Sequence, residues 1–343
     1  MKAIRVHEHG GIEQLRIDEI STPKPSSEEV LLKIKAVGMN HMDLWVRKGL
    51  PGFNLPLPII LGCEASGVVE ESGSKANRFK KGDDVVINPL ISCGDCPACK
   101  RGEDHYCPSF GLYGETQDGF DSEYTVISEK ILLPKPKSLS FEEAAAIPVT
   151  FITAWEMLVG KCKVREGQTV LVIAASSGVG TAAVQIAKLH GARVIATAGS
   201  DEKLSLARKL GADEVINHRS SDIAKEVKKM TGGRGVEIVF EHVGAATWEA
   251  SLRSLAHLGK IVTCGATTGA EVKLQLTHLF IKQQQIIGST MGPSASLKTI
   301  LELTGKGKLK PVIDHIFPFS QVKEAHERLE GRGQFGKIVL RPD

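Results

Sequence analysis

The pattern of apolar and polar positions divides the 343-residue chain near residue 150. Before that point, short apolar stretches are separated by frequent Gly and Pro, and residues 29–40 alternate like a half-buried strand. Further short strands are expected at residues 2–6, 15–20, 67–72 and 83–89. The first part of the chain is therefore predicted to be irregular and rich in strands.

After residue 150, continuous apolar runs alternate with stretches of helical periodicity. The run TVLVIAA at 169–175 is typical of a parallel strand buried on both faces, and residues 178–190 have apolar positions at helical spacing. Further strands are expected at 192–199, 213–218, 236–243, 259–266 and 284–291, and a last amphipathic helix and strand at 320–330 and 336–342. This alternation predicts an α/β fold with a doubly wound, six-stranded parallel sheet of the Rossmann type.

The turn between the first buried strand and its helix, AASSGVG, has features of a dinucleotide-binding loop. Exposed amides at a helix N-terminus bind the diphosphate of a dinucleotide, and small residues allow close backbone approach. Ala175 and Ser177 stand where the first two glycines of GxGxxG would be, and Gly180 holds the third position. We expect cofactor contacts from Ser177, Gly178, Val179 and Gly180. The alternative is a tight strand–helix connection that binds nothing.

The end of the second buried strand bears on the choice between NAD and NADP. An NAD-specific site usually carries Asp or Glu there, to bind the ribose 2′-hydroxyl. Here the strand ends in Gly199 and Ser200, Lys203 lies one turn into the next helix, and His218 and Arg219 close the third strand. These positions favour the 2′-phosphate of NADP(H) over NAD(H). The alternative is that Lys203 and Arg219 are solvated surface residues.

Four cysteines on one short loop form the strongest single motif of the chain. Cys93, Cys96, Cys99 and Cys107 follow the spacing C-x2-C-x2-C-x7-C. Four thiolates at such spacing can bind one tetrahedral zinc ion, and a site with four protein ligands leaves no open position for substrate. We expect one structural zinc per subunit in a lobe at about residues 92–108. A reduced or disulfide-linked loop is the alternative.

The composition and net charge of the chain argue against nucleic acid or a membrane surface as a partner. Hydrophobic residues make up 42% of the chain, charged residues 24%, and the net charge is +3 with both signs interspersed. This composition is ordinary for a soluble globular protein and gives no footprint for nucleic acid or a membrane surface. No signal peptide or long apolar span is visible, so we expect a cytoplasmic protein that acts on a small molecule.

Together these motifs resemble the medium-chain dehydrogenase/reductase superfamily, which contains zinc alcohol dehydrogenases and quinone reductases. The resemblance rests on GCEASGVVEESGSKANRFKKGDDV, the four-cysteine lobe, AIPVTFITAWEML and VLVIAASSGVG, and it covers essentially the whole chain. It implies a GroES-like catalytic domain over residues 1–149 and 288–343, carrying the zinc lobe, and a Rossmann domain over 150–287. It also implies a homodimer or homotetramer.

The resemblance implies further site residues. A basic residue that meets the cofactor diphosphate is expected at His41, and Trp45 and Tyr113 are candidates to line an apolar substrate pocket or to pack in the core. Additional cofactor contacts are expected at Thr153, Val243, Cys264, Gly265, Ala266 and Lys337.

The resemblance does not extend to the residues that bind the catalytic zinc ion in alcohol dehydrogenases. The positions expected to hold Cys, His and Cys are Asn40, Cys63 and Val149 here, and Met42 replaces a Ser or Thr that relays a proton. One good ligand cannot hold a catalytic zinc against water. In these positions the chain resembles the quinone-reductase branch, which usually lacks the four-cysteine lobe. We therefore expect a vacated catalytic metal site beside a retained structural zinc.

Asn40 and Cys63 are the candidate catalytic residues. The Asn40 amide could donate a hydrogen bond to a carbonyl oxygen, whereas Cys63 could equally be an inert core residue. The expected activity is NADPH-dependent reduction of activated acceptors such as quinones and conjugated enones. One alternative is an active zinc alcohol dehydrogenase that recruits Asp43 or Glu64 as unusual ligands. Another is a non-catalytic NADPH-binding protein.

Overall fold

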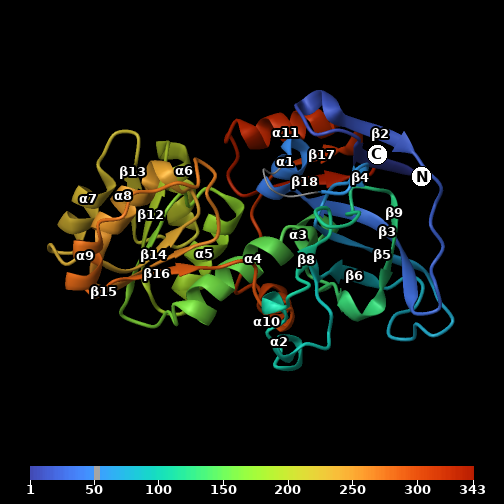
Figure 1. The fold of residues 1–343 in the computed structure, drawn as a ribbon, viewed down its shortest axis with the longest axis horizontal. Coiled ribbons are helices and arrows are strands. Elements are labelled where there is room, and N and C mark those ends of the chain that lie inside the picture. The colour runs from blue at the N-terminus through green and yellow to red at the C-terminus, as the bar shows by residue number, and fades with distance from the viewer. Residues whose placement is uncertain (50–54) are drawn as a thin grey trace. The chain divides into compact units, whose positions relative to one another are not determined.

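The computed structural model describes residues 1–49 and 55–343, and the chain divides into two compact units (Figure 1). The first unit comprises Met1–Val149, Pro293–Gly307 and Pro311–Asp343; the second comprises Thr150–Gly292 and Lys308–Lys310. The return to the first unit follows Gly292, beyond the expected position at residue 288. Gly292 packs closely against α4 of the second unit, since a side chain there would meet Ile152 and Glu156.

The second unit contains a six-stranded sheet in the order β13-β12-β11-β14-β15-β16, and every neighbouring pair is parallel. The predicted doubly wound α/β fold is therefore confirmed. Its strands are β11 (Thr169–Val172), β12 (Arg193–Ala198), β13 (Glu214–Asn217), β14 (Val236–Glu241), β15 (Leu255–Thr263) and β16 (Gln285–Gly288). Its helices are α5 (Gly178–Leu189), α6 (Asp201–Lys209), α7 (Ile223–Met230), α8 (Ala245–Ser254) and α9 (Leu276–Ile281), and α4 (Pro148–Trp155) leads into it.

The first strand of this sheet ends earlier than its apolar run predicts. β11 stops at Val172, although the apolar run continues to Ala175. Ala174 has a φ of 48°, and its amide donates to Thr197 Oγ1 over 3.0 Å. The chain therefore leaves the sheet after Val172, and the small residues that follow form the loop before α5. Buried side chains of β11, β12, β14 and β15, among them Leu171, Ile195, Val239 and Ile261, form the core.

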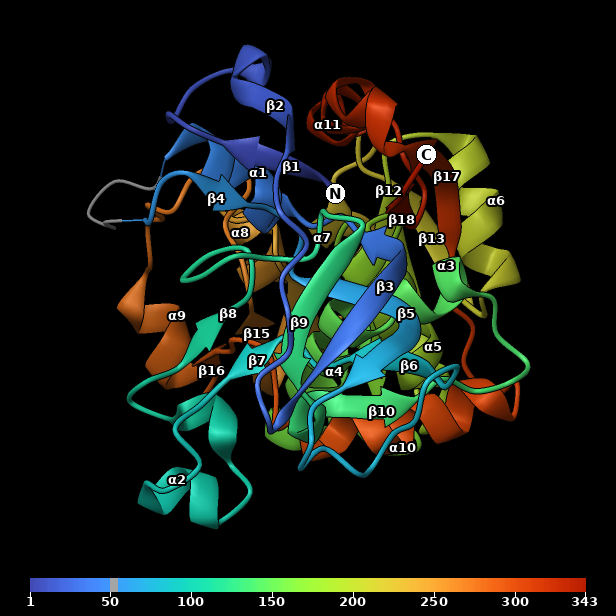
Figure 2. The ribbon, with the colours of Figure 1, turned by 90° about the vertical axis from the view of Figure 1, so that its right-hand side faces the viewer.

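The first unit is built on strands around a buried apolar core, and all of its described strand pairs are antiparallel except β17 with β18 (Figure 2). A seven-stranded sheet runs in the order β10-β6-β5-β3-β18-β17, with β9 also paired to β3, and a three-stranded sheet runs β2-β1-β4. The strands are β1 (Lys2–Val6), β2 (Leu15–Glu19), β3 (Glu29–Gly38), β4 (Ile59–Ile60), β5 (Glu64–Ser72), β6 (Asp84–Ile87), β7 (Leu90–Ile91), β8 (Gly111–Leu112), β9 (Tyr124–Ser128), β10 (Leu132–Pro134), β17 (Ile313–Pro318) and β18 (Lys337–Arg341).

Three strands bring distant parts of the sequence to one place in this unit. β3 pairs with β5 so that Gly38 lies opposite Glu64, and β18 pairs with the other side of β3 so that Val339 also lies opposite Gly38. The end of β3, the start of β5 and the start of β18 therefore meet. This register brings the candidate catalytic residues Asn40 and Cys63 close together, because they lie beside the paired positions Gly38 and Glu64.

Short helices complete the first unit: α1 (His41–Lys48), α2 (Pro97–Lys100), α3 (Phe141–Ala145), α10 (Ala295–Gly305) and α11 (Val322–Glu330). Helix α1 begins directly after β3, with Asn40 as its N-cap residue and Asp43 completing a capping box. Within residues 1–49 and 55–343, no helix is long and apolar enough to cross a membrane.

Candidate functional site

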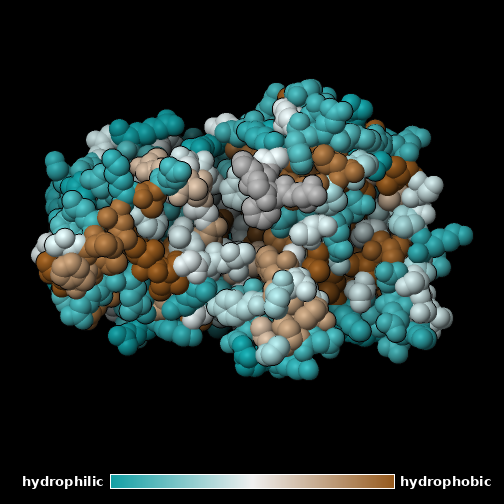
Figure 3. Space-filling view, in the orientation of Figure 1, coloured by the Kyte–Doolittle hydropathy of each residue, from teal (hydrophilic) through white to brown (hydrophobic). Residues whose placement is uncertain are grey.

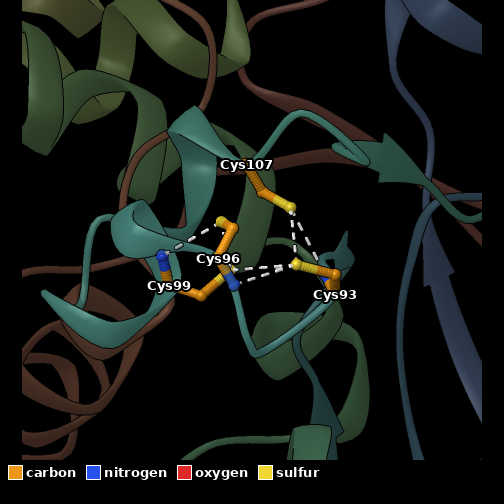
Figure 4. Close-up of side chains that lie close together, drawn as sticks. All are labelled: Cys93, Cys96, Cys99 and Cys107. Atoms are coloured by element: carbon orange, nitrogen blue, oxygen red, sulfur yellow. Dashed lines mark hydrogen bonds between the residues drawn. The ribbon is translucent and has the colours of Figure 1, made fainter.

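The four cysteines of the lobe converge on one point (Figure 4). The Cys96–Cys99 and Cys93–Cys107 sulfur pairs are 3.5 Å apart, Cys93 and Cys99 are 4.0 Å apart, and all four sulfurs lie within 4.8 Å of one another. A tetrahedron with zinc–sulfur bonds of about 2.3 Å has edges of about 3.8 Å. The sulfurs therefore have the spacing that one zinc ion requires, and all four residues would hold it.

Backbone amides in the lobe donate hydrogen bonds to the cysteine sulfurs, and such bonds stabilise thiolates. Amide groups donate to the sulfurs of Cys93, Cys96 and Cys107 over 3.3–3.5 Å. The amides of Asp95 and Cys96 lower the pKa of Cys93 to about 6. Burial and the neighbouring Cys96 sulfur raise the pKa of Cys99 to about 11. A divalent cation would favour the thiolate form of all four.

Asn40 lies at the centre of a second polar cluster, formed where β3, β5 and β18 meet. Its Nδ2 donates to Glu64 Oε1 over 2.9 Å, to the Gly38 carbonyl over 3.1 Å and lies 3.2 Å from Cys63 Sγ. Its Oδ1 accepts from Lys337 Nζ over 2.8 Å. The amide is therefore fully engaged within the protein, and the expected donation to a substrate carbonyl would require this network to break.

Lys337 supplies the positive charge of this cluster. Its Nζ is 2.6 Å from Glu64 Oε1 and also donates to Asn40 and to the Met39 carbonyl, so its three hydrogens all have acceptors. The residue is 4% exposed, and Glu64 is 0% exposed. The second Glu64 oxygen accepts from the Val149 amide over 2.6 Å. From the sequence, Lys337 is expected to contact the cofactor. In the structure its ammonium group instead donates all its hydrogen bonds to residues of the first unit.

The buried carboxyl groups of Asp43 and Asp121 lie close enough to Cys63 to affect its thiol. Burial raises the pKa of Asp43 to about 6, although the amides of Asn40 and Gly62 donate to it over 2.6 and 3.3 Å. Burial and the charge of Asp43 also raise the pKa of Asp121. Burial, with Asp43 nearby, raises the pKa of the Cys63 thiol well above its ordinary value. At neutral pH Cys63 is therefore a neutral, buried thiol.

The residues around Cys63 do not form a group of three or more possible metal ligands in the described part of the chain. In the part of the chain that the structure describes, the four lobe cysteines are the only group of three or more His, Cys, Asp or Glu side chains close enough to share a metal. Around Cys63, an ammonium group already neutralises Glu64, and an amide occupies the position of a ligand. Asp43 and Glu64, which the sequence suggests as unusual zinc ligands, do not belong to such a group among the described residues.

His41 is a half-buried histidine with several basic side chains nearby. Burial lowers its pKa to about 4, and the charges of Arg332, Lys337 and Lys48 add to that effect. A half-buried, neutral imidazole beside basic side chains is suited to donate a hydrogen bond to an anionic group such as a diphosphate. Of the expected pocket residues, Trp45 contacts His41 with ring centroids 6.3 Å apart.

Tyr113, the other candidate pocket residue, packs on Phe120 at a centroid distance of 5.0 Å. Burial raises the pKa of its phenol above the ordinary value. The half-buried ring lies against the core of the first unit. This contact favours a packing role for Tyr113 over its role as a lining residue.

In the second unit, Ser177 caps α5 and accepts from the Gly180 amide over 2.9 Å. A side chain at Gly180 would come within 2.5 Å of the Ala174 carbonyl, so the close helix–strand approach requires glycine. Gly178, Val179 and Gly180 form the first turn of α5, as a dinucleotide loop requires.

The residues expected around the 2′-position of the ribose also come together. Ser200 caps α6 and accepts from the Lys203 amide over 3.4 Å. A side chain at Gly199 would lie 3.1 Å from both His218 and Arg219. Burial lowers the pKa of His218, and the charges of Arg219 and Lys203 lower it further. Three basic groups thus gather where β12 and β13 end.

The remaining expected cofactor residues lie at other strand ends of the second unit or on α4. Val243 follows β14, and Cys264, Gly265 and Ala266 follow β15. Thr153 lies on α4 with its hydroxyl 3.6 Å from Met291 Sδ.

Sequence reasoning missed two residues beside Val243. Buried Glu241 accepts from the amides of Val243 and Gly244, and His242 lies 3.2 Å from the Ser177 hydroxyl. Their signal was a polar pair at the end of a buried strand.

Comparisons with known proteins agree with this architecture. Residues 26–137 match the alcohol dehydrogenase GroES-like domain, and residues 178–325 match the zinc-binding dehydrogenase family. An NAD-dependent alcohol dehydrogenase of Sulfurisphaera tokodaii is 34% identical, with 100% of both chains covered. A quinone oxidoreductase of Homo sapiens is 32% identical over 99% of this chain and 97% of its own. A crystal structure of an NAD-dependent alcohol dehydrogenase is 48% identical, with a TM-score of 0.97 and full coverage of both chains.

Proposed function

The chain belongs to the medium-chain dehydrogenase/reductase superfamily, and we propose that it is an NADPH-dependent reductase of quinones, conjugated enones or similarly activated carbonyl compounds, with a structural zinc and without a catalytic one. A bound nicotinamide supplies the hydride, and the protein orients the acceptor and excludes water. Activated acceptors need little polarisation of their oxygen, so they suit a site without a Lewis acid.

The observation that carries this proposal is the closed network around Asn40. At the positions where the family resemblance implies zinc ligands, this chain has an amide, a neutral thiol and an apolar residue: Asn40, Cys63 and Val149. The Glu64 carboxylate, which accepts from Asn40, is already paired with Lys337 at 2.6 Å. A divalent cation at this place would have to displace an ammonium group and an amide that satisfy each other.

Preference for NADP(H) is supported by the basic residues at the ends of β12 and β13. Lys203, His218 and Arg219 lie together there, and the loop after β12 offers Gly199 and Ser200 in place of a carboxylate. Relatives named as NAD-dependent are 33–48% identical to this chain, so most positions differ between them and it. The cofactor selectivity of this chain depends on its own residues at these strand ends.

The test is an acceptor panel assayed with both cofactors. Quinones, conjugated enones, simple aldehydes and primary alcohols are offered with NADPH or NADH, or with their oxidised forms. The proposal predicts a higher kcat/KM for NADPH and for the activated acceptors. Turnover of primary alcohols that chelators abolish would favour the zinc alcohol dehydrogenase alternative. Tight NADPH binding without turnover of any acceptor would favour the non-catalytic alternative.

We propose further that the protein is a cytoplasmic homodimer or homotetramer that associates through the second unit. β16 is an edge strand with unpaired backbone groups, and beside it α9 exposes Leu276, Phe280 and Ile281 at 61–68%. A brown apolar area covers α9 and β16 in Figure 3. Light scattering should give two or four subunits, and Phe280→Glu should lower that number. A monomeric wild-type protein would contradict this.

A further inference from the structure

We propose that His242 is a positioning residue for cofactor binding, because it holds the Ser177 hydroxyl so that its hydrogen can be donated only to a phosphate oxygen of the cofactor. This inference rests on the proposed dinucleotide-binding function. It adds a residue to the diphosphate site, at the strand next to the one that carries the loop.

The direction of each hydrogen bond follows from the partners. His242 Nε2 is 3.0 Å from the Ile173 carbonyl oxygen and 3.2 Å from Ser177 Oγ. A carbonyl oxygen can only accept, so Nε2 carries the hydrogen and has no lone pair to offer. Ser177 Oγ therefore accepts from His242, as it also does from the Gly180 amide over 2.9 Å.

The hydroxyl hydrogen of Ser177 is then left without use inside the protein. Both acceptor positions of its oxygen are occupied, and no acceptor for its hydrogen occurs among residues 1–49 and 55–343. Ser177 is the N-cap of the 12-residue helix α5, whose first amides also lack helical acceptors. A phosphate oxygen at this helix end would accept from the hydroxyl and the amides together.

The surrounding structure fixes the imidazole ring. β14 lies next to β11 in the sheet, with Phe240 opposite Val172, and His242 comes directly after β14. The ring is 8% exposed and contacts Phe240 edge-on, with centroids 6.0 Å apart. Glu241 accepts from the next two backbone amides over 3.1 and 3.0 Å, so the backbone on the C-terminal side of His242 is also held.

The experiment measures the Kd of NADPH by fluorescence titration for wild type, His242→Phe, Ser177→Ala and the double variant. Ser177→Ala removes the hydrogen bond to the phosphate, and His242→Phe leaves the Ser177 hydroxyl free to turn away from the phosphate, so each single change should raise Kd by up to about ten-fold. The double variant should be no weaker than Ser177→Ala, because His242 acts on the cofactor only through the Ser177 hydroxyl. His242→Gln, which keeps a side-chain N–H donor, should recover part of the affinity.

Two further readouts separate this inference from a structural effect and from the proposed function. The Kd of adenosine 2′-phosphate, which lacks the diphosphate, should be unchanged in His242→Phe, and unfolding midpoints should show that each variant is folded. Losses that simply add in the double variant, or an equal loss for adenosine 2′-phosphate, would overturn the role of His242. Failure of wild type to bind NADPH and NADH would instead overturn the proposed function.

Discussion

The buried pair of Glu64 and Lys337 allows a quantitative prediction about the stability of the protein. The two groups are 2.6 Å apart, and their side chains are 0% and 5% exposed. Removing one partner of such a pair leaves the other charge buried, which costs about 3–5 kcal/mol. For a domain of this size, about 2–4 °C are lost per kcal/mol, so Lys337→Met and Glu64→Gln should each lower the unfolding midpoint by about 6–20 °C.

A double-mutant cycle tests whether the two charges depend on each other. Glu64→Gln combined with Lys337→Met removes both charges, so its midpoint should lie well above the value expected from adding the two single losses. Lys81 and Glu70 provide the matched control, because their ion pair has the same length of 2.6 Å but lies on the surface. Lys81→Met should leave the midpoint unchanged. Calorimetry measures all five proteins, and single changes no larger than the control would refute the reasoning.

Three further predictions concern other residues. Cys63→Ala should cost about 1 kcal/mol of stability and keep the enzyme active, whereas loss of both activity and a metal ion would contradict a vacated site. Lys203→Ala should raise the KM for NADPH about ten-fold and leave NADH unaffected, whereas equal effects would show no contact with the 2′-phosphate. Asp43 has its pKa raised to about 6, so the folded state binds more protons than the unfolded state and stability falls as pH rises from about 4 to 6. Asp43→Asn should remove this part of the pH dependence of chemical unfolding, and an unchanged pH profile would be inconsistent with it.

Much of the fold could be predicted because its signals are local. Apolar runs and the residues between them indicate each parallel strand, and the strand–helix alternation implies their arrangement. The end of β11 could not be predicted in this way. Residues 173–175 are apolar and continue the pattern, but the positive φ of Ala174 and its bond to Thr197 turn the chain away.

The candidate sites differ in how far the sequence reveals them. The four cysteines lie on one loop, so their spacing alone predicts convergence. Lys337 and Glu64 are 273 positions apart, and only the pairing of β18 and β5 on the two sides of β3 brings them together. His242 reaches Ser177 because β14 neighbours β11, which depends on strand order rather than on local pattern.

Zinc content per subunit is the most direct test of a structural zinc without a catalytic one. The protein is saturated with zinc, freed of loosely bound metal by desalting, and analysed by elemental mass spectrometry against its amino-acid content. The structure provides four cysteine sulfurs at one place and a closed Asn40–Glu64–Lys337 network at the other. We predict one zinc ion per subunit, lost on chelation together with thermal stability. Two tightly bound zinc ions per subunit would contradict the account.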